Sequence, residues 1–147
     1  MVNPMTAVLA VTLFVPIASE QRVQMRDLPP AVRTAVEAET RGSTLKGLSK
    51  EVEHGQTFYE AETTISGHSR DLLFDSNGTL VEVEEEIQLS AAPEPVRAAL
   101  AGAGRLVKLE SVTKGPNVTY EAHVVRNGKS TEILLDAAGK RVKEGSS

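Results

Sequence analysis

The sequence predicts an α+β fold built from two tandem αββββ units, each with a helix packed on one face of an antiparallel sheet. Three observations lead to this prediction: blocks of sequence recur along the chain, each copy opens with a helical pattern, and alternating segments follow each helix. Because neither a helix nor a sheet buries its apolar side alone, each helix must cover one sheet face. The sheets of the two units are expected to adjoin or to be continuous.

The repeat is indicated by blocks that match in the same order. Two of them recur 61 positions apart, a spacing that takes Tyr59 to Tyr120 and Asp75 to Asp136. Upstream of them, a short segment that contains a Val-Arg pair also recurs. Several matched blocks in one order are the signature of an internal repeat. The two longer matches are 57–62 with 118–123, and 72–81 with 133–142.

Each copy is expected to open with a short helix that follows prolines. Val32 and Val36 recur at helical spacing in the first copy, and Val96 and Leu100 do so in the second. Proline suits a first helical turn, where its missing N–H removes no hydrogen bond. The sequence therefore predicts two short helices, the first of them with Asp27 as its N-cap.

Four strands are expected after each helix, joined by tight turns. Tyr59, Ala61 and Ile65 alternate with polar residues, as in an antiparallel sheet with one buried face. Gly67 stands between two such segments, and glycine in a short connection is typical of a hairpin turn. The last strand of the second copy is expected over 140–144.

An Asp-x-x-Gly motif occurs in both copies, at Asp75 to Gly78 and at Asp136 to Gly139. Asp at the first position and Gly at the fourth suit a type I turn with a bulge between two strands. The first copy also admits a calcium loop, because glutamates follow it at 82–86 and calcium prefers oxygen ligands. The turn explains both copies, whereas calcium explains only the first, so the turn is favoured.

These motifs together resemble those of the PepSY-like family, a relative of the bacterial β-lactamase inhibitor proteins. The resemblance lies in the prolines before a short Val-Arg helix, the Tyr-Glu-Ala strand and the strand-Asp-x-x-Gly-strand hairpin. It implies two PepSY-like repeats, over 27–88 and 91–147, in an exported protein that inhibits or assists another protein. The chain lacks the cysteines and the aromatic-rich binding face of the β-lactamase inhibitors, so no inhibitory residue carries over.

The N-terminal segment predicts export. Residues 1–19 carry no charge and contain an apolar run over 5–18, which is shorter than the roughly 20 residues that cross a bilayer. The run fits the apolar region of a signal peptide over 1–19, and a buried first strand or helix is the alternative. We expect cleavage between Pro16 and Gln21, a periplasmic or secreted product, and no stable membrane span after cleavage. The lack of cysteine excludes disulfides and thiolate metal sites.

Composition and motifs argue against several function classes. A net charge of −4 without clustered Lys and Arg argues against nucleic-acid binding. No nucleophile elbow, P-loop or dinucleotide fingerprint occurs, and no histidine is spaced for a metal site with another histidine. We therefore assign no catalytic residue, metal ligand or cofactor, and expect a non-enzymatic binding or inhibitory module for another exported protein. The alternatives are a small exported hydrolase with an unrecognised site and an accessory or chaperone-like envelope protein.

The candidate binding surface is the sheet face opposite the helices. Apolar residues at alternate strand positions are assigned to the helix side, which leaves the residues between them outside. Three glutamates over 82–86 share this outer face, where like charges repel and cannot be buried. A solvated face or a protected edge is the simpler interpretation, and an acidic patch for a basic partner is the sharper one. The candidate binding residues are Phe58, Glu60, Glu62, Glu82, Glu84, Glu86, Glu121 and His123.

Overall fold

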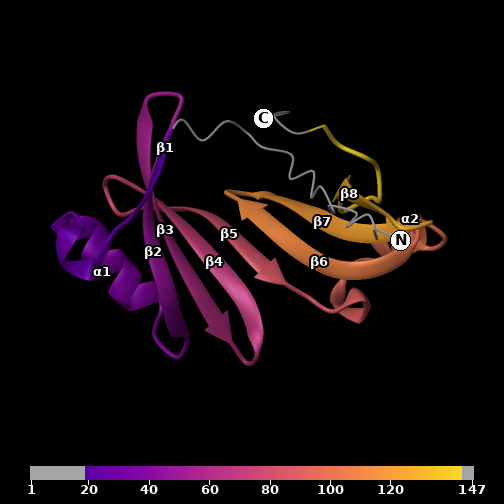
Figure 1. Ribbon diagram of the computed structural model, residues 1–147, viewed down its shortest axis with the longest axis horizontal. Helices are drawn as coiled ribbons and strands as arrows, with labels where there is room; N and C mark the ends of the chain where they lie inside the picture. The colour runs from indigo at the N-terminus through magenta and orange to yellow at the C-terminus, as the bar shows by residue number, and fades with distance from the viewer. Residues whose placement is uncertain (1–18, 144–147) are drawn as a thin grey trace, which may run out of the picture.

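The computed structural model describes residues 19–143, whose arrangement is drawn in Figure 1. The predicted signal peptide over 1–19 lies outside the described residues except for Ser19, which belongs to the first strand. Within the described part of the chain, no helix is long and apolar enough to cross a membrane.

One antiparallel sheet of eight strands forms the body of the protein, and the strands follow one another across it in chain order. Two short α-helices and two 3₁₀ turns interrupt the run of strands. In chain order the elements are β1 (Ser19–Arg22), η1 (Met25–Asp27), α1 (Pro30–Glu39), β2 (Thr44–Glu53), β3 (Gln56–Ile65), β4 (His68–Asp75), β5 (Leu80–Glu86), η2 (Leu89–Ala91), α2 (Glu94–Leu100), β6 (Arg105–Lys114), β7 (Asn117–Arg126) and β8 (Lys129–Asp136).

The prediction of two tandem αββββ units is wrong. The described strands form a single eight-stranded sheet, the continuous arrangement that the sequence allowed beside adjoining sheets, because β5 pairs with β6 over residues 83–86. This pairing satisfies backbone groups that would stay open at the edges of two separate sheets. The halves also differ from the predicted unit, since within residues 19–143 β1 precedes α1 and three strands follow α2. The segment expected as a strand over 140–144 makes, in its described part, a single bridge from Arg141 to Leu135.

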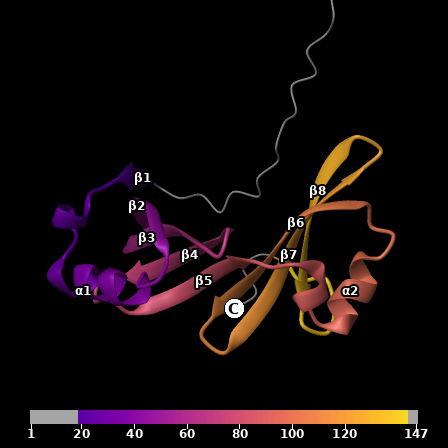
Figure 2. The same cartoon turned by 90° about the horizontal axis from the view of Figure 1, so that it is seen from below.

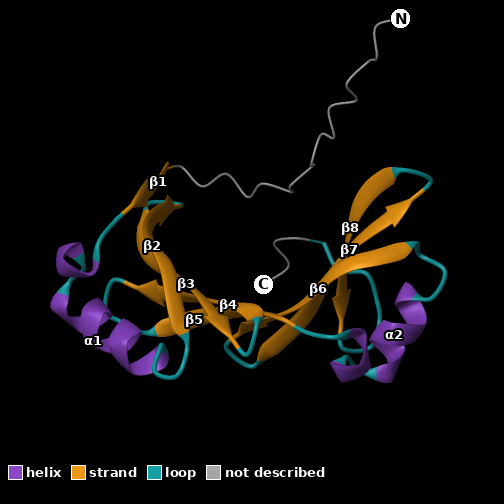
Figure 3. Cartoon of the chain, turned by 60° about the horizontal axis from the view of Figure 1, so that its bottom comes forward, coloured by secondary structure: helices purple, strands orange, loops and turns teal. Residues whose placement is uncertain are grey.

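Both helices lie on the same side of the sheet, one over each half, as Figures 2 and 3 show. The helical spacing of apolar residues explains this packing. Val32 and Val36 of α1 are fully buried against β2, β3 and β4, where Phe74 is the largest fully buried side chain. Val96 and Leu100 of α2 are buried against β6, β7 and β8. The core therefore consists of two clusters, one beneath each helix.

The Asp-x-x-Gly segments form tight turns, as the sequence predicts. Asp75 Oδ1 accepts hydrogen bonds of 2.9 Å from the backbone N–H groups of Asn77 and Thr79. Asp136 accepts the same two bonds in the second half. Gly78 has a φ of +82°, in the left-handed region that glycine enters without a steric penalty. Because the same bonds recur in both halves, the turn accounts for the motif and a calcium loop does not.

The sheet is curved, and its two ends bend toward the side without helices (Figure 3). That side is therefore concave. It presents the strand residues that alternate with the apolar core residues, and its polar side chains form the candidate functional site.

Candidate functional site

Carboxylates cover the helix-free side of the sheet, which we call the acidic face. The assignment follows from strand register, because residues directly opposite one another on paired strands share a face. Residues that alternate with them, such as Ala61 and Leu72, are buried beneath the helices. Acidic residues of this face include Glu20, Glu51, Glu60, Glu62, Asp71, Glu82, Glu84, Glu86, Glu110, Glu121 and Glu132.

Two rows of carboxylates run across neighbouring strands of the acidic face. Within each row, every acidic residue lies directly opposite the next one. Like charges in such cross-strand pairs destabilise a sheet, and each pair contributes on the order of 0.2–1 kcal/mol. The rows therefore work against folding unless another charge compensates them. They consist of Glu62, Asp71 and Glu84 on β3 to β5, and of Glu86, Glu110 and Glu121 on β5 to β7.

Basic side chains compensate part of this charge. Arg22 reaches from β1 across β2, and its Nη1 lies 2.7 Å from Oε1 of Glu62 on β3. On β6, Lys114 Nζ lies 3.0 Å from Glu82 Oε2, and only 15% of the Glu82 side chain is exposed. Glu82 is therefore half-buried, which is possible because a lysine on the neighbouring strand neutralises it.

Two other glutamates of the face stay protonated near neutral pH. Burial, and then the hydrogen bond and charge of Glu51, raise the pKa of Glu60 to about 8. Burial, and then the hydrogen bond and charge of Glu82, raise the pKa of Glu84 to about 8. In each case burial disfavours the charged form and a second glutamate repels it. The concave face thus holds more acidic groups than it can ionise at once.

All eight candidate residues from the sequence lie on the acidic face. Phe58 is half-buried there, opposite Glu51 on β2. The binding role of these residues stays a prediction. The sequence alone does not single out Asp71 and Glu110, whose places on the face depend on strand register. The alternation of Asp71 with the buried Leu72 is a signal that could have revealed the first of them.

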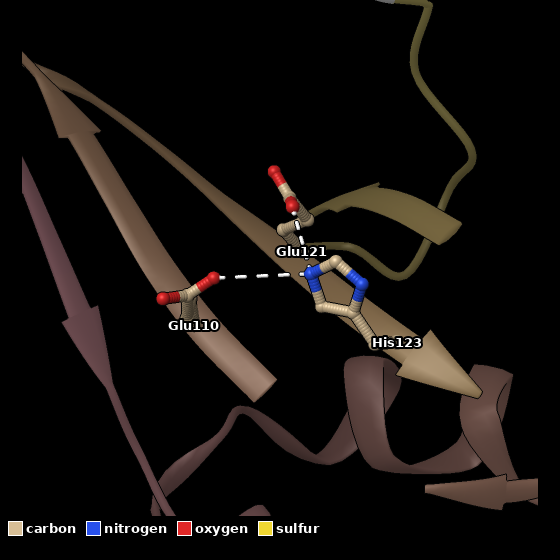
Figure 4. A group of neighbouring side chains, drawn as sticks. All are labelled: Glu110, Glu121 and His123. Atoms are coloured by element: carbon tan, nitrogen blue, oxygen red, sulfur yellow. Dashed lines mark ion pairs between the residues drawn. The ribbon is translucent and has the colours of Figure 1, made fainter. Parts of the chain in front are cut away.

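A mixed cluster on β6 and β7 brings together Glu110, Glu121 and His123 (Figure 4). His123 Nε2 lies 3.0 Å from Glu121 Oε1 and 4.0 Å from Glu110 Oε2. The three ligand-type atoms lie within 4.8 Å of one another. Lys108 Nζ contacts the other oxygen of the buried glutamate, at 2.5 Å from Glu110 Oε1. Spacing along a helix could not reveal this cluster, because its members meet across two strands.

A pocket adjoins this cluster at β8. It is lined by Glu121 and Glu132 together with Arg141 and Lys143. Burial, and then the charge of Glu132, raise the pKa of Glu121. The pocket therefore places the carboxylates of Glu121 and Glu132 beside Arg141 and Lys143, two basic residues of the segment after β8.

The fold is shared with solved structures, although no family model and no curated protein matches the chain. A Bacteroides eggerthii protein provisionally described as periplasmic gives a TM-score of 0.66 at 16% identity, with 79% of this chain and 86% of that chain covered. A DUF2874 family protein from Bacteroides ovatus gives 0.62 at 14% identity, over 79% and 85%. A BLIP-like protein from Bacteroides fragilis gives 0.60 at 17% identity, over 79% and 84%. The chain thus has a BLIP-like fold.

Proposed function

We propose that this protein is an exported, non-enzymatic module whose acidic face binds a basic segment of another exported protein. The observation that carries the proposal is the pair of carboxylate rows on the concave side of the sheet. Directly opposed like charges lower stability. Groups with strongly perturbed pKa values concentrate at functional sites, because function retains charges that folding alone disfavours.

The chemistry of the face favours a partner rich in Lys and Arg. Cations placed between the carboxylates would remove the repulsion within both rows. Their attraction would exceed that of exposed ion pairs, because the carboxylates are partly buried and less screened by water. Phe58 and Leu73 add apolar contact area on the same face. Binding faces commonly combine such apolar anchors with charges that steer association.

Export is supported by the apolar segment before Ser19 and by the fold. A structure of the same fold is provisionally described as periplasmic. We also propose PepSY-like repeats over 27–88 and 91–147 as the origin of the two halves. This assignment is supported by strand register. Tyr59 lies opposite Phe74 in the first half, and the residues 61 positions after them, Tyr120 and Leu135, lie opposite each other in the second half.

The proposal is tested by neutralising the middle of the acidic face. We expect the triple change of Glu82, Glu84 and Glu86 to Gln to weaken binding of the partner at least tenfold, because Glu86 loses its charge and Lys114, no longer paired with Glu82, would repel a basic segment. The measurement is chemical cross-linking of the purified protein to components of its native envelope extract, quantified at several salt concentrations. Binding by the wild-type protein should also weaken as salt rises.

A matched variant changes the same number of glutamates on the opposite side of the molecule. Glu37, Glu39 and Glu94 lie exposed on the two helices, and their change to Gln should leave cross-linking unaltered. Equal losses in the two triple variants would show that net charge, rather than the acidic face, controls association. Unchanged cross-linking in both variants would move the binding site away from this face.

A further inference from the structure

We propose that Glu110, Glu121 and His123 form a binding site for a divalent transition cation, for which Zn²⁺ is the best match. The donor set is two carboxylate oxygens and one imidazole nitrogen, all of them ligands that zinc accepts. The inference is independent of the protein partner proposed above, because it concerns the affinity of the isolated chain for a metal ion.

The spacing of the three donor atoms suits one ion between them. Ligands held about 2.0–2.2 Å from a tetrahedral zinc ion are about 3.4 Å from one another. The observed separations from His123 Nε2 are 3.0 Å to Glu121 Oε1 and 4.0 Å to Glu110 Oε2. The two distances lie on either side of the required spacing, so small side-chain rotations would bring all three donor atoms to a zinc ion. The donors project from paired strands β6 and β7, which hold them in place (Figure 4).

The other ring nitrogen of His123 provides a second, separate indication. Its Nδ1 faces Glu132 Oε2 on β8 at 4.0 Å, and the two residues lie directly opposite in strand register. A histidine that binds a metal usually directs its second nitrogen to a carboxylate, which orients the ring and increases its basicity. The carboxylate of Glu132 would take that role after moving about 1 Å closer, to hydrogen-bond distance, and its side chain is only 13% exposed.

Glu110 adds a reason for a cation at this point. It is 7% exposed and lies between Glu86 and Glu121 in the second carboxylate row. Lys108 contacts its Oε1, whereas its Oε2 faces His123 at a distance too long for a hydrogen bond. A divalent ion on Oε2 would neutralise two glutamates at once and leave the lysine contact intact.

The donor chemistry discriminates between cations. Calcium takes six to eight oxygen ligands, and magnesium keeps octahedral oxygen coordination, so an imidazole nitrogen in a three-donor set suits neither ion. Zinc, with four ligands, would bind these three side chains and take a fourth ligand from the adjoining pocket lined by Glu121 and Glu132.

The experiment is calorimetric titration of the purified protein with ZnCl₂, and with CaCl₂ in parallel. We expect one equivalent of Zn²⁺ to bind, His123→Gln to weaken the affinity at least 100-fold, and Glu132→Gln to weaken it 10- to 100-fold. His68→Gln is the matched control: this histidine also contacts a glutamate, with Nε2 3.1 Å from Glu85 Oε1, but lies outside the cluster. Its affinity for zinc should equal that of the wild type.

The imidazole resonances in NMR spectra provide a second measurement on the wild-type protein, which does not depend on the folding of any variant. Zn²⁺ should shift the ring signals of His123 and leave those of His68 in place. The proposal is overturned if Zn²⁺ shows no saturable binding, if His123→Gln binds it as tightly as the wild type, or if Ca²⁺ binds equally well and independently of His123.

Discussion

Replacing Gly78 by alanine is expected to lower the free energy of unfolding by about 3 kcal/mol. Gly78 closes the turn between β4 and β5 with a φ of +82°, where an L-residue is strained by about 1–2 kcal/mol. A Cβ atom there would also lie 2.6 Å from the carbonyl oxygen of Ala31 and 2.8 Å from its carbon. These are backbone atoms in the first turn of α1, so the helix itself would have to move away from the sheet.

Gly67→Ala is the matched control for this variant. Gly67 has the same φ of +82° in the turn between β3 and β4, but no atom lies within 4 Å of the position of an added Cβ. Its change to alanine should therefore lower the free energy of unfolding by only about 1 kcal/mol, through the backbone alone. Urea unfolding of both variants measures the difference. An equal decrease in the free energy of unfolding for both variants would mean that α1 does not pack closely against the turn at Gly78.

The close approach explains why the Asp-x-x-Gly motif recurs. Gly139 holds the same position in the second half, where an added Cβ would collide with the backbone of Pro95 in α2. The glycine of each motif thus meets two demands, a left-handed turn and contact with a helix. The sequence indicates the need for a left-handed turn. It does not indicate the contact with the helix, because that contact depends on how the helix crosses the sheet.

Local sequence patterns predicted most of the helices and strands. They did not predict features that depend on pairing between distant strands. Helical spacing and prolines located both helices, but Asp27 does not cap α1: its side chain accepts a 3.0 Å hydrogen bond from Gln24 N in the preceding 3₁₀ turn. The choice between adjoining sheets and one continuous sheet, which the sequence left open, depends on the pairing of β5 with β6. Two repeats with similar strands give no local sign of which edges will meet.

The same distinction applies to the candidate site. Alternation along single strands was enough to place Phe58 and the glutamates of β5 on one face. The carboxylate rows and the cluster around His123 required cross-strand register, which moves every neighbour if it shifts by a single residue. The sequence therefore indicated where the acidic face is and underestimated how densely its charges are packed.

The double change of Glu60 and Glu84 to Gln is expected to stabilise the protein by about 2 kcal/mol at pH 9, after allowance for solvent screening. Each carboxyl has a pKa of about 8 in the folded protein, against an ordinary value of 4.5. Above pH 8 both must ionise in a partly buried, negatively charged setting. A neutral amide of the same shape avoids that ionisation and can still donate a hydrogen bond to the neighbouring glutamate.

The sign of the pH dependence follows from proton binding. Between about pH 4.5 and 8 the folded protein holds protons on these carboxyls that the unfolded chain has released. The free energy of unfolding therefore decreases as the pH rises through this window. The contribution of these two carboxyls to it is greatest below pH 4.5. Burial is the largest cause of both raised pKa values, and neighbouring acidic groups add to it: Glu51, Glu62 and Asp71 around Glu60, and Glu82, Glu110 and Glu121 around Glu84.

Urea unfolding at intervals from pH 5 to pH 9 measures this dependence. The wild-type free energy of unfolding should fall across the range, whereas that of the double variant should stay nearly level. Glu37→Gln with Glu39→Gln on the exposed side of α1 removes the same number of carboxylates and should reproduce the wild-type slope. If the double variant instead keeps the wild-type slope, the two carboxyls ionise freely in the folded protein. The acidic face would then be a solvated surface whose charges exert little strain, and its crowding would no longer argue for a basic partner.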